Sequence, residues 1–331
     1  MIPWLRGWTD WAFRPEGAEP LALFRILVGL AIAVSIGSVL TDGVVEVLWV
    51  DVAHGGYRTF ERVPWLVEQL GGPTLPVMTG LTVATVVASL VLMAGLGGRL
   101  TAFLLLQLYM AVDINTHAGG SYDLLIKNAL WLCVLTPTTA TWSLDAWILR
   151  GRPWRGRPVP AWARGLIVFQ LILMYWTTGL QKLSAHWTPG GEFDALYYIL
   201  QQPSWQLYDL SFFAWLYPLT QVGTAVTWVW EVTAPVWLLA LIYRGTREKG
   251  GWLRTTFNAW DVRTIYALVG IVFHGALVLT MNVGSFPMIS LAFYVCLWDA
   301  DEWRSMGRGV RGLFRRPPSR ATAAEAATVQ P

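Results

Sequence analysis

Eight apolar runs constrain the fold of this chain more than any other feature of its sequence. A helix needs about 20 mostly apolar residues to cross the hydrocarbon core of a bilayer. The runs are Leu21–Leu40, Pro76–Leu96, Leu100–Ala111, Leu124–Leu135, Trp162–Leu180, Val222–Tyr243, Ile265–Met281 and Phe286–Trp298. We therefore predict an all-α protein, a polytopic membrane bundle of about eight transmembrane helices. Since the third, fourth and eighth runs are short, we expect them to be tilted, extended by polar ends or partly re-entrant.

The composition excludes an ordinary soluble domain. Hydrophobic residues make up 55% of the 331 residues, charged residues only 14%, and the mean hydropathy is +0.46. Many of the 21 tryptophans lie near the ends of the runs, where indole prefers the headgroup boundary. Cys133 and Cys296 lie inside apolar runs, so we expect buried hydrophobic residues rather than a disulfide. We expect this chain to lie in the lipid bilayer and not to bind nucleic acid.

The distribution of positive charge predicts the orientation. With eight spans, one side of the membrane receives both termini and 20 of the 24 Lys and Arg residues. The other side keeps only Arg58, Arg62, Lys127 and Lys182. By the positive-inside rule, the basic side faces the cytoplasm. We expect a multi-pass protein of the bacterial inner membrane with both termini in the cytoplasm.

The chain is predicted to form one membrane domain over residues 1–314. Its first twenty residues are aromatic and carry two arginines, which indicates an amphipathic lead-in at the interface. No internal repeat divides the apolar runs. The last residues, 315–331, are small, polar and proline-bearing, so we predict a disordered cytoplasmic tail.

The segment YWTTGLQKLSAHW carries the strongest candidate site. If its helix continues, Tyr175, Thr178, Gly179, Lys182 and His186 lie on one face. An amine at the end of a membrane helix either snorkels to the interface or serves a function. His186, one turn further on, either shares a proton with Lys182 or anchors the helix at the interface.

Two further ionisable residues lie inside apolar runs. His274 lies in the middle of IVFHGAL, where it is either a packed residue bonded to a neighbouring helix or a functional one. Glu231 lies in the middle of VTWVWEVTAPVWLL, where an acid is expected to be protonated, paired or facing a polar cavity. Pro235 follows four residues later and predicts a kink.

The segment DINTHAGGSYDLLIKN is too polar for contact with lipid. It carries Asp113, His117, Asp123 and Lys127, and its glycine pair permits a turn. We predict a re-entrant or cavity-lining segment on the outer face. Asp113 and His117 have a spacing that metal ligands can adopt, but two ligands without a third do not make a metal site.

Three motifs resemble the HTTM-domain membrane proteins, the group that contains vitamin K-dependent gamma-carboxylases. LALFRILVGL, from Leu21, is similar to the opening of that domain, and GLQKLSAHWTPG is similar to its lysine signature. FHGALVLTMNVGSFPMISLAFYV resembles the late helices of the family. The residues that match are Thr178, Gly179, Lys182, Leu183, Trp187, Gly190 or Gly191, His274, Gly284 and Phe286.

The resemblance implies an enzyme that uses reduced vitamin K or another quinol. In the carboxylases the lysine that matches Lys182 is the base toward the reduced cofactor, whose oxygenated product removes a proton from glutamate before carbon dioxide adds. A lysine is a base only while it is neutral. We assign catalysis to Lys182, His186 and His274, contact with the cofactor to Tyr175, Thr178, Trp187 and Glu231, and no metal.

The sequence departs from the animal carboxylases in one respect that leaves a second function open. Those enzymes carry a large extramembrane region that holds the protein substrate, and we expect none here. The substrate of an enzyme of this type is a peptide or lipid on the extracytoplasmic side. The alternative is a non-catalytic membrane subunit that acts with a soluble partner in the maturation or export of a secreted, toxin-like peptide. A transporter is the third hypothesis, which the lack of a repeat disfavours.

Overall fold

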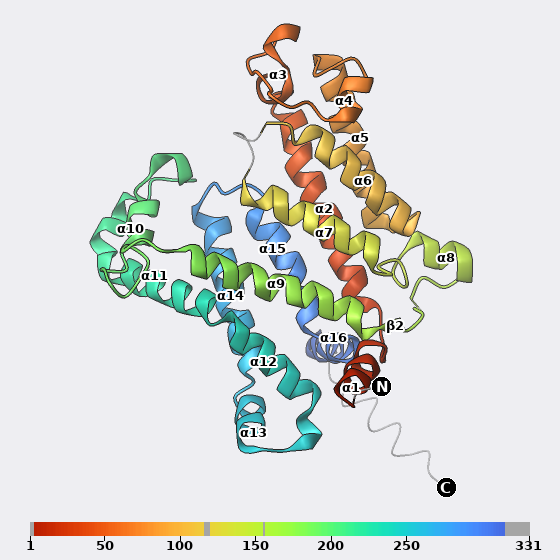
Figure 1. Cartoon of the computed structure of the whole chain (residues 1–331), viewed down its shortest axis with the longest axis vertical. Coiled ribbons are helices and arrows are strands. Elements are labelled where there is room, and N and C mark those ends of the chain that lie inside the picture. Colours follow the sequence, from red (N-terminus) through yellow and green to blue (C-terminus); the bar gives the residue numbers. More distant parts are fainter. Residues whose placement is uncertain (1–2, 116–119, 155, 315–331) are drawn as a thin grey trace, which may run out of the picture.

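The computed structural model describes residues 3–115, 120–154 and 156–314, and Figure 1 shows that this part of the chain is mostly helical. The predicted all-α class is confirmed. The predicted tail, residues 315–331, lies outside the described residues.

The helices are α1 (Pro3–Ala12), α2 (Glu19–Thr41), α3 (Val45–Trp49), α4 (Trp65–Gln69), α5 (Leu75–Ala94), α6 (Gly98–Val112), α7 (Ser121–Leu135), α8 (Leu144–Arg150), α9 (Ala161–Gln181), α10 (Ala195–Leu200), α11 (Tyr217–Val232), α12 (Ala234–Gly245), α13 (Trp252–Ala259), α14 (Val262–Thr280), α15 (Phe286–Tyr294) and α16 (Ala300–Phe314). The 3-10 helices are η1 (Val52–His54), η2 (Pro203–Trp205), η3 (Ser211–Leu216), η4 (Arg247–Lys249) and η5 (Val295–Leu297), and β1 (Pro15–Glu16) pairs with β2 (Val159–Pro160).

Among the described residues, four helices are long and apolar enough to cross a membrane: α2, α5, α9 and α14. The segment formed by η3, α11 and α12 is also long and apolar enough to cross a membrane, but it bends by 55° at the break before α12. If this bent segment is counted as one span, the number of candidate spans is five. Many large apolar side chains on these helices are exposed, for example Val34, Val87 and Val272. Such side chains suit contact with lipid rather than water.

The predicted count of about eight spans is not confirmed. The apolar runs Leu100–Ala111, Leu124–Leu135 and Phe286–Trp298 form α6, α7 and α15, which have 15, 15 and 9 residues. At 1.5 Å per residue, even 15 residues extend only about 22 Å, less than the roughly 30 Å of hydrocarbon. Helix α6 ends at its polar cap Asp113, whereas α15 gives way to the 3-10 helix η5 within its own apolar run.

Two groups of helices pack around a shared centre. In the first group α2 packs on α5, α5 on α6 and α6 on α7; in the second, α9 packs on α11 and α12, and α12 on α14. Helix α15 contacts α2, α7, α9 and α14, so it joins the groups (Figure 1). Phe24 of α2 and Phe293 of α15 meet edge to face in this centre, with ring centroids 5.1 Å apart.

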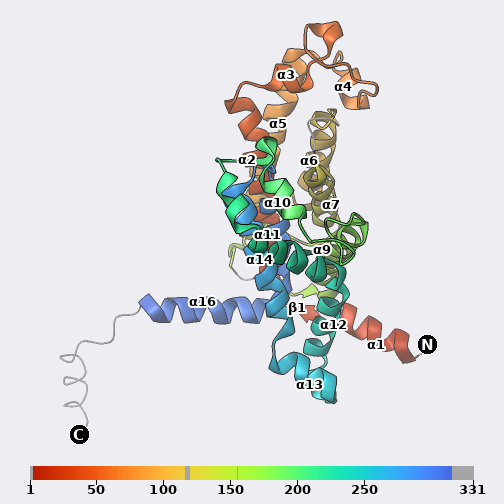
Figure 2. The same ribbon diagram turned by 90° about the vertical axis from the view of Figure 1, so that its left-hand side faces the viewer.

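The two ends of the bundle differ. Helices α3 and α4 lie at one end, and α1, α13 and α16 lie at the other, which we call the terminal end (Figure 1). Figure 2 shows that α1 and α16 leave the terminal end in opposite directions, across the long axis of the molecule. The interfacial lead-in that the sequence analysis expects for the first twenty residues stays a prediction.

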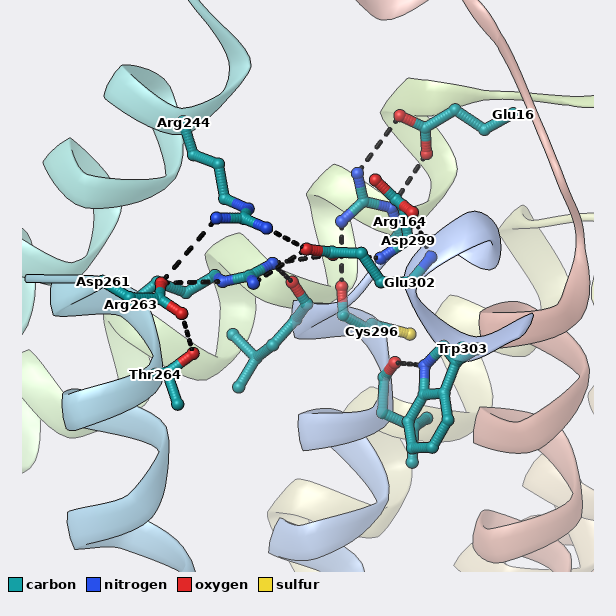
Figure 3. A network of polar contacts seen from close by, with 12 residues as sticks. Glu16, Arg164, Arg244, Asp261, Arg263, Thr264, Cys296, Asp299, Glu302 and Trp303 are labelled. Atoms are coloured by element: carbon teal, nitrogen blue, oxygen red, sulfur yellow. Dashed lines mark hydrogen bonds and ion pairs between the residues drawn. The ribbon is translucent and has the colours of Figure 1, made fainter. Parts of the chain in front are cut away.

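Ion pairs tie the helices together at the terminal end. Figure 3 shows Arg244 of α12 and Arg263 of α14 converging on the carboxylate of Glu302 in α16. Arg263 donates to both carboxylate oxygens, over 2.8 and 2.9 Å. Burial opposes ionisation of Glu302, but bonds from Arg263, the Asp299 backbone and Arg244 outweigh it and lower the pKa to about 2. Glu302 therefore remains ionised at neutral pH and holds α16 against the bundle.

We expect Glu302→Gln to destabilise the docking of α16. The pKa of Glu302 in the folded protein is about 2, below the ordinary 4.5. Its stabilising contribution is thus complete above pH 4.5 and is lost as the pH falls from there towards 2. Thermal unfolding of the purified protein between pH 3 and 7 measures this. The pH dependence should be weaker in the variant than in the wild type, and identical profiles would contradict the role of Glu302.

Candidate functional site

Helix α9 ends earlier than the sequence suggests. Its last helical residue is Gln181, and Lys182 caps it with a ψ of 75°. The helix does not continue through His186, so the face shared by Tyr175, Gly179 and Lys182 does not extend to His186. The motif TPGG follows the histidine closely, and proline and glycine do not continue a helix. Lys182 therefore lies at a helix terminus, and His186 lies in the loop beyond it.

Lys182 is paired with Glu231. The side chain of Glu231, in the last turn of α11, is 4% exposed and that of Lys182 is 17% exposed, and the amine contacts the carboxylate directly. The amine also lies 4.8 Å from the centre of the Trp187 ring, which favours a cation at this position. The break between α11 and α12 follows at once, so the predicted kink before Pro235 is confirmed.

A glycine makes this pairing geometrically possible. A Cβ atom placed on Gly179 would lie 2.7 Å from the backbone nitrogen of Val232 and 2.8 Å from the Cβ of Glu231. Only glycine lets the backbones of α9 and α11 approach this closely. Because Gly179 precedes Lys182 by three residues, the same contact brings the amine to the carboxylate.

A second polar cluster lies about two helical turns from Lys182, around Tyr175 of α9. Tyr294 of α15 donates to the hydroxyl oxygen of Tyr175 over 2.9 Å, and the Tyr175 hydroxyl lies 2.5 Å from Nε2 of His274. All three residues are buried. The Tyr175 ring also packs on Trp230, with ring centroids 4.3 Å apart. Since Tyr294 donates to Tyr175, Tyr175 is free to donate to Nε2 of His274, which leaves the imidazole proton on Nδ1.

Three buried polar atoms beside this cluster have no hydrogen-bond partner among the described residues: Nδ1 of His274, Oγ of Ser290 and Nε1 of Trp237, whose ring packs on Tyr175 and Tyr294. Phe286 and Tyr294 both contact the His274 ring, at centroid distances of 5.3 and 6.0 Å. Ser290 lies four residues from each and so shares their face of α15. The ring nitrogen of His274 and the hydroxyl of Ser290, on the face of α15 that meets His274, thus both lack a partner, and such buried atoms normally bind a polar group.

The remaining predicted site residues lie apart from both clusters. Nδ1 of His186 lies 2.7 Å from a carboxylate oxygen of Asp194, and its ring contacts Tyr198. Thr178 is exposed, and its hydroxyl donates to the carbonyl of Met174 in its own helix over 2.7 Å. The structure therefore brings together Lys182, Glu231 and Trp187 in one cluster, and Tyr175 and His274 in the other.

The predicted re-entrant segment is described only in part. Lys127 forms an ion pair of 2.7 Å with Asp113, and Asp123 accepts from the Tyr109 hydroxyl over 2.6 Å. His117 lies outside the described residues. Within residues 3–115, 120–154 and 156–314, no group of three His, Cys, Asp or Glu side chains could hold a metal ion.

Sequence reasoning did not assign a role to Tyr294. The available signal was its spacing: Phe286 and Tyr294 are eight residues apart, which places both on the face of one helix. That face meets His274 from a different helix. A single sequence does not reveal such a meeting, because it depends on how the helices pack.

Comparison with known protein families identifies the chain. A family model for the HTTM domain matches residues 13–263, more than half of the sequence. The matched region contains Tyr175, Lys182 and Glu231, and it ends before His274. Searches among curated proteins and among solved structures find no match. The chain therefore belongs to the HTTM-domain family of membrane proteins.

Proposed function

We propose that this protein is an integral membrane enzyme that resembles the vitamin K-dependent gamma-carboxylases, with Lys182 as its base. The observation that carries the proposal is the direct contact between the Lys182 amine and the buried carboxylate of Glu231. An ionisable pair at membrane depth is costly, and such pairs typically mark functional sites. The lysine motif and the HTTM domain add the family context.

Glu231 can accept a proton from the Lys182 amine, which would leave the amine neutral. In a site of low dielectric, two opposite charges that lose their hydration can exchange a proton and become a neutral amine and a neutral acid. The neutral Lys182 amine can then accept a proton from a hydroxyl group of the cofactor. The Trp187 ring, 4.8 Å from the amine, holds the charged form of Lys182 in position, so the transfer of its proton to Glu231 works against this contact.

The types of residue present, aromatic rings and hydrogen-bonding groups, suit a reduced quinone-type cofactor. When bound, such a cofactor supplies the reducing chemistry and the hydroxyl proton. Aromatic rings that suit a quinone ring surround the second cluster, and His274 Nδ1 and Ser290 Oγ could bond a ring oxygen. An apolar groove of about 370 Å³ between α11 and α14 contains Trp230, which also packs on Tyr175. This groove could take an apolar tail.

The direct test is turnover of the cofactor. The purified protein, reconstituted in lipid nanodiscs, is given reduced vitamin K in air, and formation of the epoxide is followed by chromatography. Formation that depends on active protein supports the proposal. Repeated absence of epoxide with several quinols, together with stable capture of a secreted peptide, would favour the non-catalytic maturation subunit instead.

We further expect Lys182 to face the extracytoplasmic side of the bacterial inner membrane. Cysteine is introduced at exposed Ser184, after replacement of Cys133 and Cys296, and is treated with a membrane-impermeant thiol reagent. It should react in intact cells, because the basic residues concentrate at the terminal end. Cysteine at Ser305 in α16 is the matched control and should react only after lysis. The reverse pattern would overturn the orientation.

A further inference from the structure

The terminal end contains a cavity that the proposed function does not use. Its volume is about 720 Å³. Its wall is formed by β1 and the start of α2, by the segment before β2, and by the start of α16. The residues that line it are Arg14, Pro15, Glu16, Gly17, Ala18, Glu19, Trp154, Gly156, Arg157, Pro158, Asp299, Ala300, Asp301 and Arg304.

The cavity lies at the level of a membrane surface. Glu19 is the first residue of the span α2, and Pro158 lies three residues before the span α9. Helices α1 and α16 leave the bundle sideways at this same end (Figure 2). Trp154 at the cavity is exposed, as expected for an indole at the headgroup boundary. A ligand of this cavity is therefore expected to come from the headgroup region.

The charges of the cavity nearly balance. Among the described residues, three arginines and four acidic residues line it; Arg155, next to the lining residue Trp154, lies outside the described residues. Glu16 accepts from Arg14 and from Arg164, each over 2.8 Å (Figure 3 shows the Arg164 contact), and Arg164 adds a further positive charge from behind the wall. Burial opposes ionisation of Glu16, but the two arginines outweigh it and lower its pKa. A ligand with a net charge would face strong repulsion from one set of these residues.

Within this balance, two of the three walls carry an exposed charged group. On the segment before β2, Arg157 is exposed and forms no ion pair with any described residue. On α16, Arg304 is shared between Glu19 and Asp301, so its single positive charge meets two carboxylates. Asp301 is 88% exposed in its side chain. The cavity thus offers a guanidinium on one wall and a carboxylate on another.

The walls are also held in place. A Cβ atom on Gly17 would lie 2.4 Å from the Cβ of Ala300 and 2.5 Å from a carboxylate oxygen of Glu19. The chain between β1 and α2 therefore lies directly against the start of α16. Because this contact and the ion pair between Glu19 and Arg304 join the same two segments, the cavity is a built feature of the fold.

We propose that this cavity binds a phosphoethanolamine headgroup, that of a phosphatidylethanolamine molecule in the adjoining leaflet. Arg14 and Arg157 would bind the phosphate, and the carboxylate of Asp301 would accept from the primary ammonium group. Arginine suits phosphate because its planar donors match the phosphate oxygens. A trimethylammonium group has no N–H to donate, so a phosphocholine headgroup satisfies only half of the site.

Lipid retention by the full-length protein tests this proposal. The protein in detergent is incubated with equal amounts of dioleoyl phosphatidylethanolamine, phosphatidylcholine and phosphatidylglycerol, and bound lipid is counted by native mass spectrometry. We expect about a tenfold preference for phosphatidylethanolamine over both others, the factor that one charge-assisted hydrogen bond provides. Equal binding of phosphatidylcholine, or stronger binding of phosphatidylglycerol, would overturn the proposal.

Surface variants locate the lipid. Arg157→Gln and Asp301→Asn should each abolish the preference, and both residues are exposed, so the fold is retained. Arg152→Gln in the same linker and Asp10→Asn in α1 change exposed residues outside the cavity and serve as controls. Both control variants should retain the preference for phosphatidylethanolamine. A preference that survives in the first two variants would contradict the site. Soluble glycerophosphoethanolamine should compete only weakly, and equal competition would overturn the assignment to a lipid.

Discussion

Lys182→Arg should abolish turnover while the protein still folds. Arginine keeps a positive charge beside Glu231, but its guanidinium does not lose its proton in proteins, so it cannot act as a base. Loss of a general base lowers turnover by about 10²–10⁴-fold. The measurement is epoxide formation from reduced vitamin K by the reconstituted protein, with thermal unfolding recorded on the same samples. Lys182→Ala should lose turnover equally.

Two control variants separate chemistry from structure. Lys127→Ala removes another lysine that is ion-paired at 2.7 Å, outside the proposed site, and should retain turnover. Lys182→Ala leaves the buried carboxylate of Glu231 unpaired, so it is combined with Glu231→Gln to restore stability. Full activity in Lys182→Arg would exclude the base role. Unfolding of the Lys182→Ala, Glu231→Gln double variant would return Lys182 to a structural role.

The parts of the site that the sequence predicts are those that depend on a single helix. Tyr175 and Lys182 lie seven residues apart, and helical periodicity alone places them on one face of α9. The unusual presence of Glu231 and His274 in apolar runs also marks them without any structure. What periodicity cannot supply is which helices meet, so the pairing of Lys182 with Glu231 and of Tyr175 with His274 required the packed fold.

The differences from the sequence analysis lie at helix ends. Helical periodicity puts His186 on the α9 face only if the helix continues, and α9 ends at Gln181. The count of about eight spans is not confirmed for a related reason, because an apolar run does not show whether its helix is long enough to cross alone. Helix α7 illustrates this: Asp123 accepts from the backbone N–H of Gly120 over 2.6 Å and so fixes the start of the helix close to its apolar run.

Gly179 connects the fold to the proposed chemistry. A methyl group on Gly179 would meet the backbone of α11 at 2.7 Å, a distance that real Cβ atoms do not tolerate. The neighbours are backbone atoms and the first carbon of Glu231, so no flexible side chain can move away. The helices themselves must separate, and Lys182 then moves away from the Glu231 carboxylate.

We expect Gly179→Ala to destabilise the protein by about 1–3 kcal/mol, the usual cost of overpacking. Turnover should fall with it, because the base and its partner lose their contact. Thermal unfolding and epoxide formation measure the two effects. Gly80→Ala in α5 is the matched control: a Cβ there meets nothing within 4 Å, and alanine is the better helix former. If both variants were equally stable and active, the close approach of α9 to α11 would not be what positions Lys182.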